Sequence, residues 1–114
     1  MDLDTIRDYC LMKNAVTEAM PFDDCVLTFK VGGKIFALMN ICELKSINLK
    51  YPSEGIDELR ANYLAVKPGY HMSKKHWNTI ELAETDWEKL SEWIDVSYNL
   101  IWESLPKKLR ETLG

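Results

Sequence analysis

The chain has 114 residues, which is enough for one domain with a single hydrophobic core. Hydrophobic residues make up 46% and charged residues 28%, a composition that excludes an intrinsically disordered chain, and no apolar run is long enough to span a membrane. The formal net charge of -4 at pH 7 argues against a strong nonspecific polyanion binder, because neutralising phosphates requires clustered positive charge. We expect one folded domain over residues 1–114.

The cysteines and the start of the chain indicate the compartment. Cys10, Cys25 and Cys42 are odd in number and lack any C-x-x-C spacing, so we expect neither a disulfide framework nor a zinc site. All three lie in apolar stretches, where a free cysteine is usually a small core residue. Asp2 and Asp4 follow the first methionine, unlike the basic start of an export signal. These features predict a cytoplasmic protein.

The first 22 residues predict a helix and then a short extended stretch. Residues 3–13 have helical spacing of their apolar side chains and a capping carboxylate from Asp2 or Asp4. Residues 15–22 read as extended or irregular. Pro21 excludes a central strand there but permits an edge strand.

Residues 25–41 predict a β-hairpin. Gly32 and Gly33 form a two-residue turn that requires positive φ, and two runs rich in β-branched and aromatic residues flank it. This turn pairs Val31 with Lys34, Phe29 with Phe36, and Leu27 with Leu38. The predicted core face holds Leu27, Phe29, Phe36 and Leu38. Lys30 and Lys34 then lie near the tip of the hairpin.

The middle of the chain predicts a third strand, a helix and a second hairpin. Residues 46–50 alternate between apolar and polar side chains, as expected of an antiparallel strand. Ser53 can cap a following helix. Residues 66–82 predict a hairpin with a long loop, in which Ser73 can cap a single helical turn.

The last third predicts one long helix. Thr85 and Glu88 have the spacing of a capping box, and apolar residues continue at helical spacing to Leu105. Pro106 interrupts this helix and suits the first turn of a short terminal helix.

Residues 67–79 are the most unusual part of the sequence. They hold both histidines together with lysines and aromatic residues, and no acidic residue occurs between Asn62 and Ile80. Residues 81–103, in contrast, carry seven acids and one base, and residues 107–110 add three bases. A basic face on an acidic protein is therefore expected near residues 67–79.

Three stretches together resemble one family. They are F-K-V-G-G-K-I-F-A-L at 29–38, P-G-Y-H-M-S-K-K-H-W-N-T at 68–79 and S-Y-N-L-I-W-E-S-L-P-K-K-L at 97–109. In this order they resemble the MmcQ/YjbR family of small bacterial proteins, over nearly the whole chain. The entry to the first hairpin departs from the family pattern, because Met20-Pro21-Phe22-Asp23 lacks the expected glycine and adds an acid.

The resemblance implies an α+β fold with a single antiparallel sheet and helices packed on one side, in a frataxin-like (CyaY-like) arrangement. With the elements above, we expect the order α-β-β-β-α-β-β-α. The resemblance also implies DNA binding through a "double wing" of two hairpins. In this sequence the wings would be the Gly32-Gly33 hairpin and the loop from Gly69 to Trp77.

Several residues of the second loop have two interpretations. Lys74 and Lys75 can contact phosphates or can simply be solvated, and the absence of nearby acids gives the two interpretations about equal weight. Trp77 can stack on a base, although a tryptophan that opens a strand is more often packed in the core. His71 and His76 do not have the spacing of a compact metal site, so we expect no metal and no cofactor.

We therefore expect a non-enzymatic protein that binds duplex DNA weakly and in a salt-sensitive way, by neutralising phosphates with little base readout. The predicted contact residues come from both hairpins: Lys30, Lys34, Tyr70, His71, Lys74, Lys75 and His76. No nucleophile with an adjacent base and no phosphate-binding glycine loop points to an enzyme. The alternative is a protein-interaction module that uses the same loop or the exposed side of the last helix.

Overall fold

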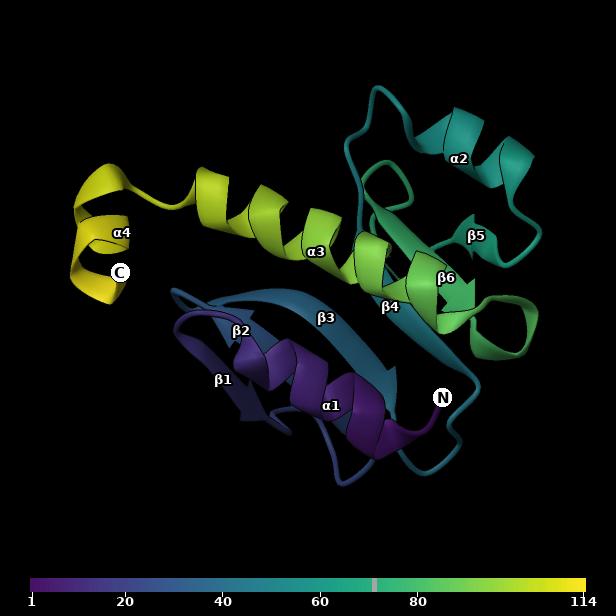
Figure 1. Ribbon diagram of the computed structural model, residues 1–114, viewed down its shortest axis with the longest axis horizontal. Helices are drawn as coiled ribbons and strands as arrows, with labels where there is room; N and C mark the ends of the chain where they lie inside the picture. Colours follow the sequence, from purple (N-terminus) through teal and green to yellow (C-terminus); the bar gives the residue numbers. More distant parts are fainter. Residues whose placement is uncertain (71) are drawn as a thin grey trace.

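The computed structural model describes residues 1–70 and 72–114, and these residues form an α+β fold with six strands in one antiparallel sheet and four α-helices (Figure 1). The strands are β1 (Val16–Ala19), β2 (Val26–Val31), β3 (Lys34–Asn40), β4 (Ser46–Lys50), β5 (Val66–Pro68) and β6 (Trp77–Glu81), in the spatial order β1-β2-β3-β4-β6-β5. The helices are α1 (Leu3–Met12), α2 (Ile56–Asn62), α3 (Trp87–Ser104) and α4 (Lys107–Leu113), and a 3-10 turn, η1 (Leu82–Glu84), precedes α3.

The α+β class and the single antiparallel sheet are confirmed, whereas the predicted order α-β-β-β-α-β-β-α is wrong. It omits β1, an edge strand that pairs with β2 from Val16↔Val31 to Ala19↔Thr28. Pro21 does not prevent this pairing because it lies beyond the last paired residue. The order also omits α4, which Pro106 introduces. The frataxin-like arrangement stays a prediction.

The β2–β3 hairpin is confirmed at its turn, but its predicted register is wrong farther along. Val31 pairs with Lys34 as expected, and a bulge between Phe29 and Lys30 then shifts the register by one residue. Phe29 therefore faces Ala37, and Phe36 is the extra residue on β3. The bulge leaves Phe36 and Ala37 both fully buried, which a regular strand buried on one face would not do.

A disulfide joins Cys25 and Cys42, so the prediction of unpaired cysteines is wrong for these two residues. Cys25 immediately precedes β2 and Cys42 follows β3, and the backbone N–H of Ile41 donates to the carbonyl of Cys25 at 2.7 Å. The antiparallel pairing therefore brings the two sulfurs together although they are 17 residues apart. Cys10 is a free, buried thiol, as expected. The cytoplasmic location stays a prediction, now without its support from unpaired cysteines.

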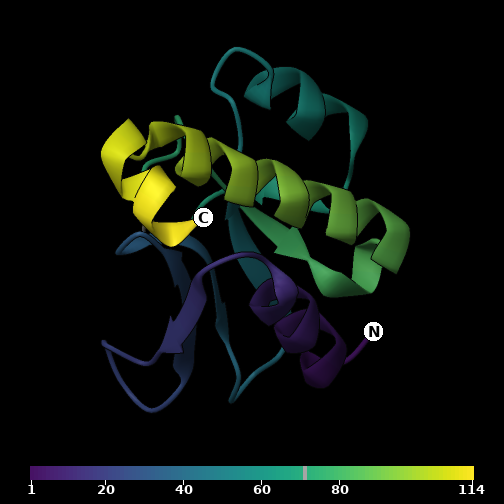
Figure 2. The same cartoon turned by 60° about the vertical axis from the view of Figure 1, so that its left-hand side comes forward.

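Helices α1 and α3 lie side by side over one face of the sheet (Figures 1 and 2). Their contact is aromatic and polar: the rings of Tyr9 and Trp87 are 5.2 Å apart, and the Tyr9 hydroxyl donates to Asp95 at 2.7 Å. The core beneath them is formed by side chains that are almost fully buried, including Ile6, Phe29, Phe36, Ile47, Leu90 and Ile94.

The predicted caps of α2 and α3 are wrong, whereas that of α1 is confirmed. Asp2 caps α1 as expected, because its carboxylate accepts from the N–H of Thr5 at 2.9 Å. For α3 the cap is Asp86, whose carboxylate accepts from the N–H of Lys89, and not the neighbouring Thr85. Helix α2 starts after Gly55 without a side-chain cap, two residues later than a Ser53 cap requires.

Ser97 of α3 separates the two halves of the sheet. Strands β3 and β4 pair from Met39↔Ile47 to Ala37↔Leu49. Next to this pair, the Ser97 hydroxyl accepts from the N–H of Lys50 at 2.8 Å and donates to the carbonyl of Phe36 at 2.5 Å. A side chain therefore satisfies two backbone groups that a longer ladder would pair, and the β2–β3 and β5–β6 hairpins diverge from this point.

Among the described residues, no helix combines the length and the apolar character that crossing a membrane requires.

Candidate nucleic-acid interface

Both predicted wings leave the sheet at the same end. The register Ala37↔Leu49, Leu49↔Asn78 and Pro68↔Asn78 aligns the two hairpins. The first wing (residues 30–34) joins β2 to β3 at this end and includes the last residues of β2 and the first of β3, and the second wing (residues 69–76) joins β5 to β6 at the same end. The structure therefore brings the predicted contact segments to one side of the molecule, separated by the divergence at Ser97.

The first wing is a tight turn held against the C-terminal part of the chain. Gly32 and Gly33 have φ values of 59° and 81°, as a two-residue hairpin turn requires. A Cβ atom on Gly32 would lie 2.7 Å from Leu105 Cδ1, so the turn packs directly on the residue between α3 and α4. Lys34 is exposed at the tip, whereas Lys30 is half-buried beside Ile35.

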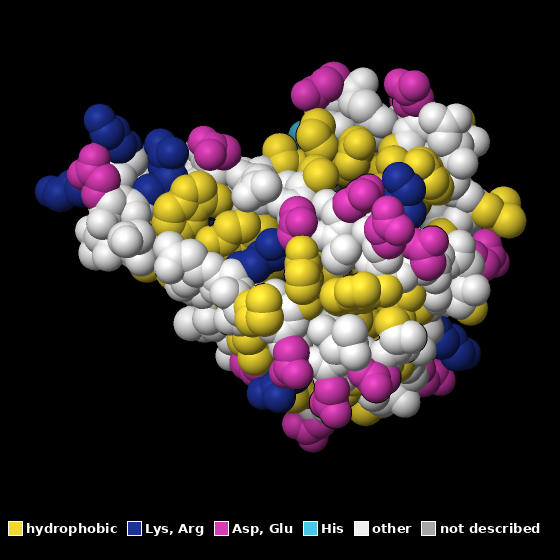
Figure 3. Space-filling view, in the orientation of Figure 1, with side chains coloured by type: hydrophobic (Ala, Val, Ile, Leu, Met, Phe, Trp, Pro, Cys, Tyr) yellow, Lys and Arg dark blue, Asp and Glu magenta, His cyan; other side chains and the backbone are white. Residues whose placement is uncertain are grey.

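Helix α4 consequently lies next to the first wing (Figures 1 and 2). Its Lys107 and Lys108 are exposed, and Arg110 pairs with Glu103 at 3.5 Å. Lys and Arg side chains gather on this projecting end of the molecule (Figure 3). The charges of α4 are visible in the sequence, but their position beside the first wing depends on the contact between Leu105 and Gly32.

The second wing is built around a close approach between Gly69 and Trp77. The N–H of Gly69 donates to the carbonyl of Trp77 at 2.8 Å, and a Cβ on Gly69 would lie 3.0 Å from both Trp77 Cβ and Trp77 O. The carbonyl of Ser73 accepts from the N–H groups of His76 and Trp77, which closes the short turn. Glycine is therefore the residue that lets the two ends of this loop meet.

Arg60 of α2 anchors the second wing, and its role was not predicted. Its guanidinium donates to the side chain of Asn78 at 2.7 Å, to the carbonyl of Trp77 at 3.1 Å and to the carbonyl of Lys74. Asn78 is buried, so Arg60 supplies the partner that a buried amide oxygen needs. The carboxylate of Asp57 forms an ion pair with the Arg60 guanidinium at 3.9 Å.

The side chains of the second wing differ in their exposure. Tyr70 is 72% exposed, Lys74 and Lys75 are exposed, and His76 is half-buried. His71 lies outside the described residues. Trp77 is half-buried and does not belong to the hydrophobic cluster of the described residues, which does not support its predicted anchoring in the core.

The lysines of the two wings are not paired with acids. Of the ion pairs among residues 1–70 and 72–114, none involves Lys30, Lys34, Lys74 or Lys75. The Lys74 ammonium instead donates to the carbonyl of Gly69 at 3.3 Å. Within the same residues no three His, Cys, Asp or Glu side chains converge as metal ligands. The positive charge at this end is available to an external anion.

Sequence and structure comparisons identify the family. The sequence model of the YjbR family matches residues 11–100. The chain belongs to the YjbR family. It is 39% identical to protein YbdF of Escherichia coli O157:H7 over 92 residues, which is 77% of this chain and 74% of that protein. It is 26% identical to protein YjbR of Escherichia coli K12, over 99% of this chain and 98% of that protein.

A solved YjbR-like structure has the same fold. The crystal structure of Deinococcus radiodurans protein DR2400, with domain DUF419, matches at a TM-score of 0.91 and 34% identity, over 98% of this chain and 87% of that chain. The predicted family is therefore confirmed. The names of these relatives specify no ligand or reaction, so the function of this member of the YjbR family must be argued from its own site.

Proposed function

We propose that this protein binds duplex DNA without catalysis, through phosphate contacts from its two wings. The observation that carries the proposal is the placement of two hairpin turns at one end of the sheet, each with lysines that form no ion pair among residues 1–70 and 72–114. Lysines positioned in this way contact phosphates and orient a protein on DNA without reading its sequence.

The contact surface includes Lys30 and Lys34 of the first wing and Tyr70, Lys74, Lys75 and His76 of the second, with His71 kept as a sequence-based prediction. Lys107 and Lys108 of α4 extend it next to the first wing. The net charge of -4 keeps long-range attraction weak. We expect dissociation constants of about 10⁻⁴–10⁻⁶ M at physiological salt, the range typical of nonspecific binding.

The salt dependence of binding tests this proposal. Fluorescence anisotropy of a short labelled duplex is measured from low to physiological salt for the natural chain and for Lys74→Ala and Lys75→Ala. Each substitution that removes a phosphate contact should lower the slope of log K against log salt by about 1. Lys107→Ala and Lys108→Ala should lower it similarly if α4 belongs to the surface.

Lys45→Ala is the matched control. Lys45 is exposed and immediately precedes β4, at the end of the sheet opposite the wings. The substitution removes the same charge as Lys74→Ala but no phosphate contact. The slope of log K against log salt should therefore stay close to that of the natural chain. An equal effect of Lys45→Ala, or no detectable binding at low salt, would contradict the proposal.

A protein-interaction module is the second candidate, and one observation favours it. Met20 and Phe22 lie between β1 and β2 and are 39% and 66% exposed. Exposed apolar side chains that are close in sequence are a common feature of protein-binding surfaces. This segment is at the end of the sheet opposite the wings. A partner bound there would be insensitive to Lys74→Ala and would lose affinity on Phe22→Ala, which separates the two candidates.

A further inference from the structure

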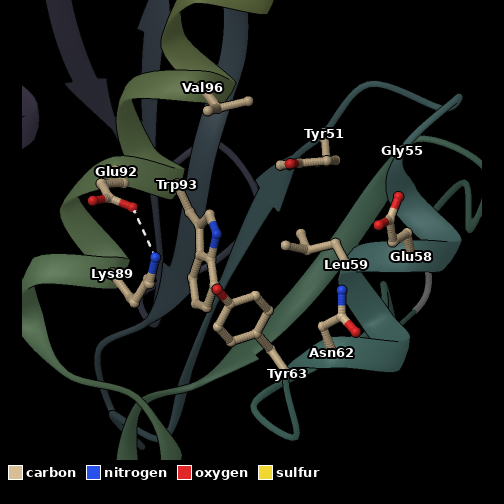
Figure 4. Close-up of a pocket in the computed structure, with 10 residues that line it drawn as sticks. All are labelled: Tyr51, Gly55, Glu58, Leu59, Asn62, Tyr63, Lys89, Glu92, Trp93 and Val96. Carbon is tan, nitrogen blue, oxygen red and sulfur yellow. Dashed lines mark hydrogen bonds and ion pairs between the residues drawn. The ribbon is translucent and has the colours of Figure 1, made fainter.

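A cleft of about 420 Å³ lies between α2 and α3, apart from the wings (Figure 4). Three of its ten lining residues are aromatic: Tyr51 follows β4, Tyr63 follows α2, and Trp93 comes from α3. Leu59 of α2 also faces the space. Its volume lies within the range of about 300–1,000 Å³ that is typical of small-molecule sites. Polar side chains from Glu58, Asn62, Lys89 and Glu92 also line it.

Trp93 presents an unused hydrogen-bond donor to this cleft. The residue is only 6% exposed, and its ring is packed edge-on against Tyr63 with centroids 5.1 Å apart. Its indole nitrogen points into the space between the helices (Figure 4). None of the hydrogen bonds among the described residues involves this nitrogen. The nitrogen is not one of the buried polar atoms that lack a partner, so an acceptor can reach it from the cleft.

The rim of the cleft has an excess of negative charge. Glu92 pairs with Lys89 at 3.3 Å, and this pair is close to neutral. Glu58 of α2 is exposed on the opposite rim and takes part in no ion pair among residues 1–70 and 72–114. On this face, carboxylates surround a hydrophobic patch over α2 and α3 (Figure 3). One uncompensated carboxylate therefore faces an aromatic surface.

The cleft already contains one cation on an aromatic face. The ammonium of Lys89 lies 5.6 Å from the centroid of Tyr63. Its hydrogen bonds to Tyr63 and then to Glu92 raise the pKa of Lys89 above its ordinary value, so it stays charged. Rings arranged in this way attract cations through their quadrupoles. Glu58 and the other aromatic rings of the cleft offer the same pairing of a carboxylate with a ring to a second, external cation.

We propose that this cleft binds a small organic cation that has a flat apolar body and a hydrogen-bond acceptor. The body lies against Tyr51 and Trp93, the positive group faces Glu58, and the acceptor receives the indole N–H of Trp93. A purely anionic ligand fits less well, because Lys89, the cation lining the cleft, is already paired with Glu92.

Three probes of similar shape test the proposal: tyramine as the cation, 4-ethylphenol as the neutral form and 3-(4-hydroxyphenyl)propionate as the anion. Binding is followed through the indole ¹H–¹⁵N resonance of Trp93, which is assigned by its loss in Trp93→Phe. Tyramine should bind about 2–5-fold more tightly than 4-ethylphenol, an effect expected of one exposed charge contact. Glu58→Gln should remove most of that difference while leaving the affinity for 4-ethylphenol unchanged.

Glu111→Gln, an exposed α4 position outside the cleft lining, is the isosteric control and should change no affinity. Glu58→Gln alters an exposed side chain, so folding is preserved, and the remaining indole resonances verify it. The proposal is overturned if the anion or the neutral probe binds best, or if Glu58→Gln weakens all three probes equally. It is also overturned if no probe shifts the Trp93 resonance at up to about 10 mM, a concentration that saturates even weak sites.

Discussion

Arg60 shows how one side chain fixes the shape of a loop that has little regular structure. Its guanidinium reaches backbone carbonyls 14 and 17 residues away and the buried amide of Asn78. The planar group with several fixed donors can serve all these acceptors together, which a lysine ammonium cannot do with the same geometry. The position of Lys74 thus depends on a residue of α2.

Arg60→Ala should lower the free energy of unfolding by about 1–3 kcal/mol, because Asn78 loses the donor to its buried amide oxygen. It should also speed tryptic cleavage after Lys74 and Lys75 in the native protein, because the loop loses its anchor. Urea titration and timed proteolysis measure both effects. Arg7→Ala is the control: Arg7 pairs with Glu18 at the surface, and its loss should cost less than about 1 kcal/mol.

The sequence could identify the residues of the wings but not what holds them. Lys74 and Lys75 are visible as a basic pair without nearby acids. Arg60 gives no such signal, because its partners are backbone carbonyls and an amide that are distant in sequence. The Asp86 cap was missed for a different reason: Thr85 and Asp86 are adjacent, both residue types cap helices, and sequence alone does not decide between them.

At the scale of elements, α3 divides the sheet into two hairpins through Ser97. The serine hydroxyl accepts from Lys50 and donates to Phe36 at the place where β3 and β4 stop pairing. Each wing therefore belongs to its own hairpin, and their separation is set by a helix and not by a loop. A rigid spacing of this kind suits a surface that must meet two phosphate positions at once.

Ser97→Ala should leave the N–H of Lys50 and the carbonyl of Phe36 without a partner in a buried place. Two such groups together should cost about 2–4 kcal/mol of stability. The amide of Lys50 should also exchange faster with deuterium. Ser91→Ala on the same helix is the control, because Ser91 donates only to the nearby carbonyl of Glu88 and should change stability by less than about 0.5 kcal/mol. Equal effects of the two substitutions would contradict this role of Ser97.

The positions of β2, β3, β4 and β6 were predictable and that of the edge strand β1 was not, whereas the register of β2 and β3 was predictable only near the turn. The Gly32-Gly33 turn determines the pairing of Val31 with Lys34 through local backbone geometry. The bulge beyond it depends on how Phe36 and Ala37 pack in the core, which is a tertiary effect. The same one-residue shift places Cys25 opposite Ile41 and beside Cys42. The disulfide was missed because the number and spacing of the cysteines do not show which strand ends meet.

At the scale of the whole molecule, the charge is divided between two regions. The wings and α4 present lysines at one end, whereas the cleft between α2 and α3 has a carboxylate-rich rim (Figure 3). The net charge of -4 averages over these regions and conceals both. The composition therefore predicts only that the affinity for a polyanion is low. The fold shows that the lysines and the carboxylates lie in different regions.

The Cys25–Cys42 bond connects the strand ends opposite the first wing and should stabilise the whole domain. Reduction, or the double substitution Cys25→Ser and Cys42→Ser, should lower the free energy of unfolding by about 3 kcal/mol, as expected for a closed loop of about this length. Urea titration with and without a reductant measures the difference.

Cys10 is the internal control in that experiment. Burial raises the pKa of the Cys10 thiol to about 12, so it stays protonated and unreactive in the folded protein. Iodoacetamide should therefore modify Cys25 and Cys42 in the reduced native chain and leave Cys10 intact, as judged by mass spectrometry. Unchanged stability on reduction, or preferential labelling of Cys10, would contradict this arrangement.

The contact between Gly32 and Leu105 makes two adjacent glycines unequal in the substitutions they accept. Gly33 has a positive φ but open space around it, so an asparagine there meets only a backbone preference that asparagine tolerates. A substitution at Gly32 would in addition place its Cβ too close to the side chain of Leu105, which is itself buried. The common Asn-Gly turn at this hairpin therefore requires the Leu105 side chain to move, whereas a substitution at the second glycine does not.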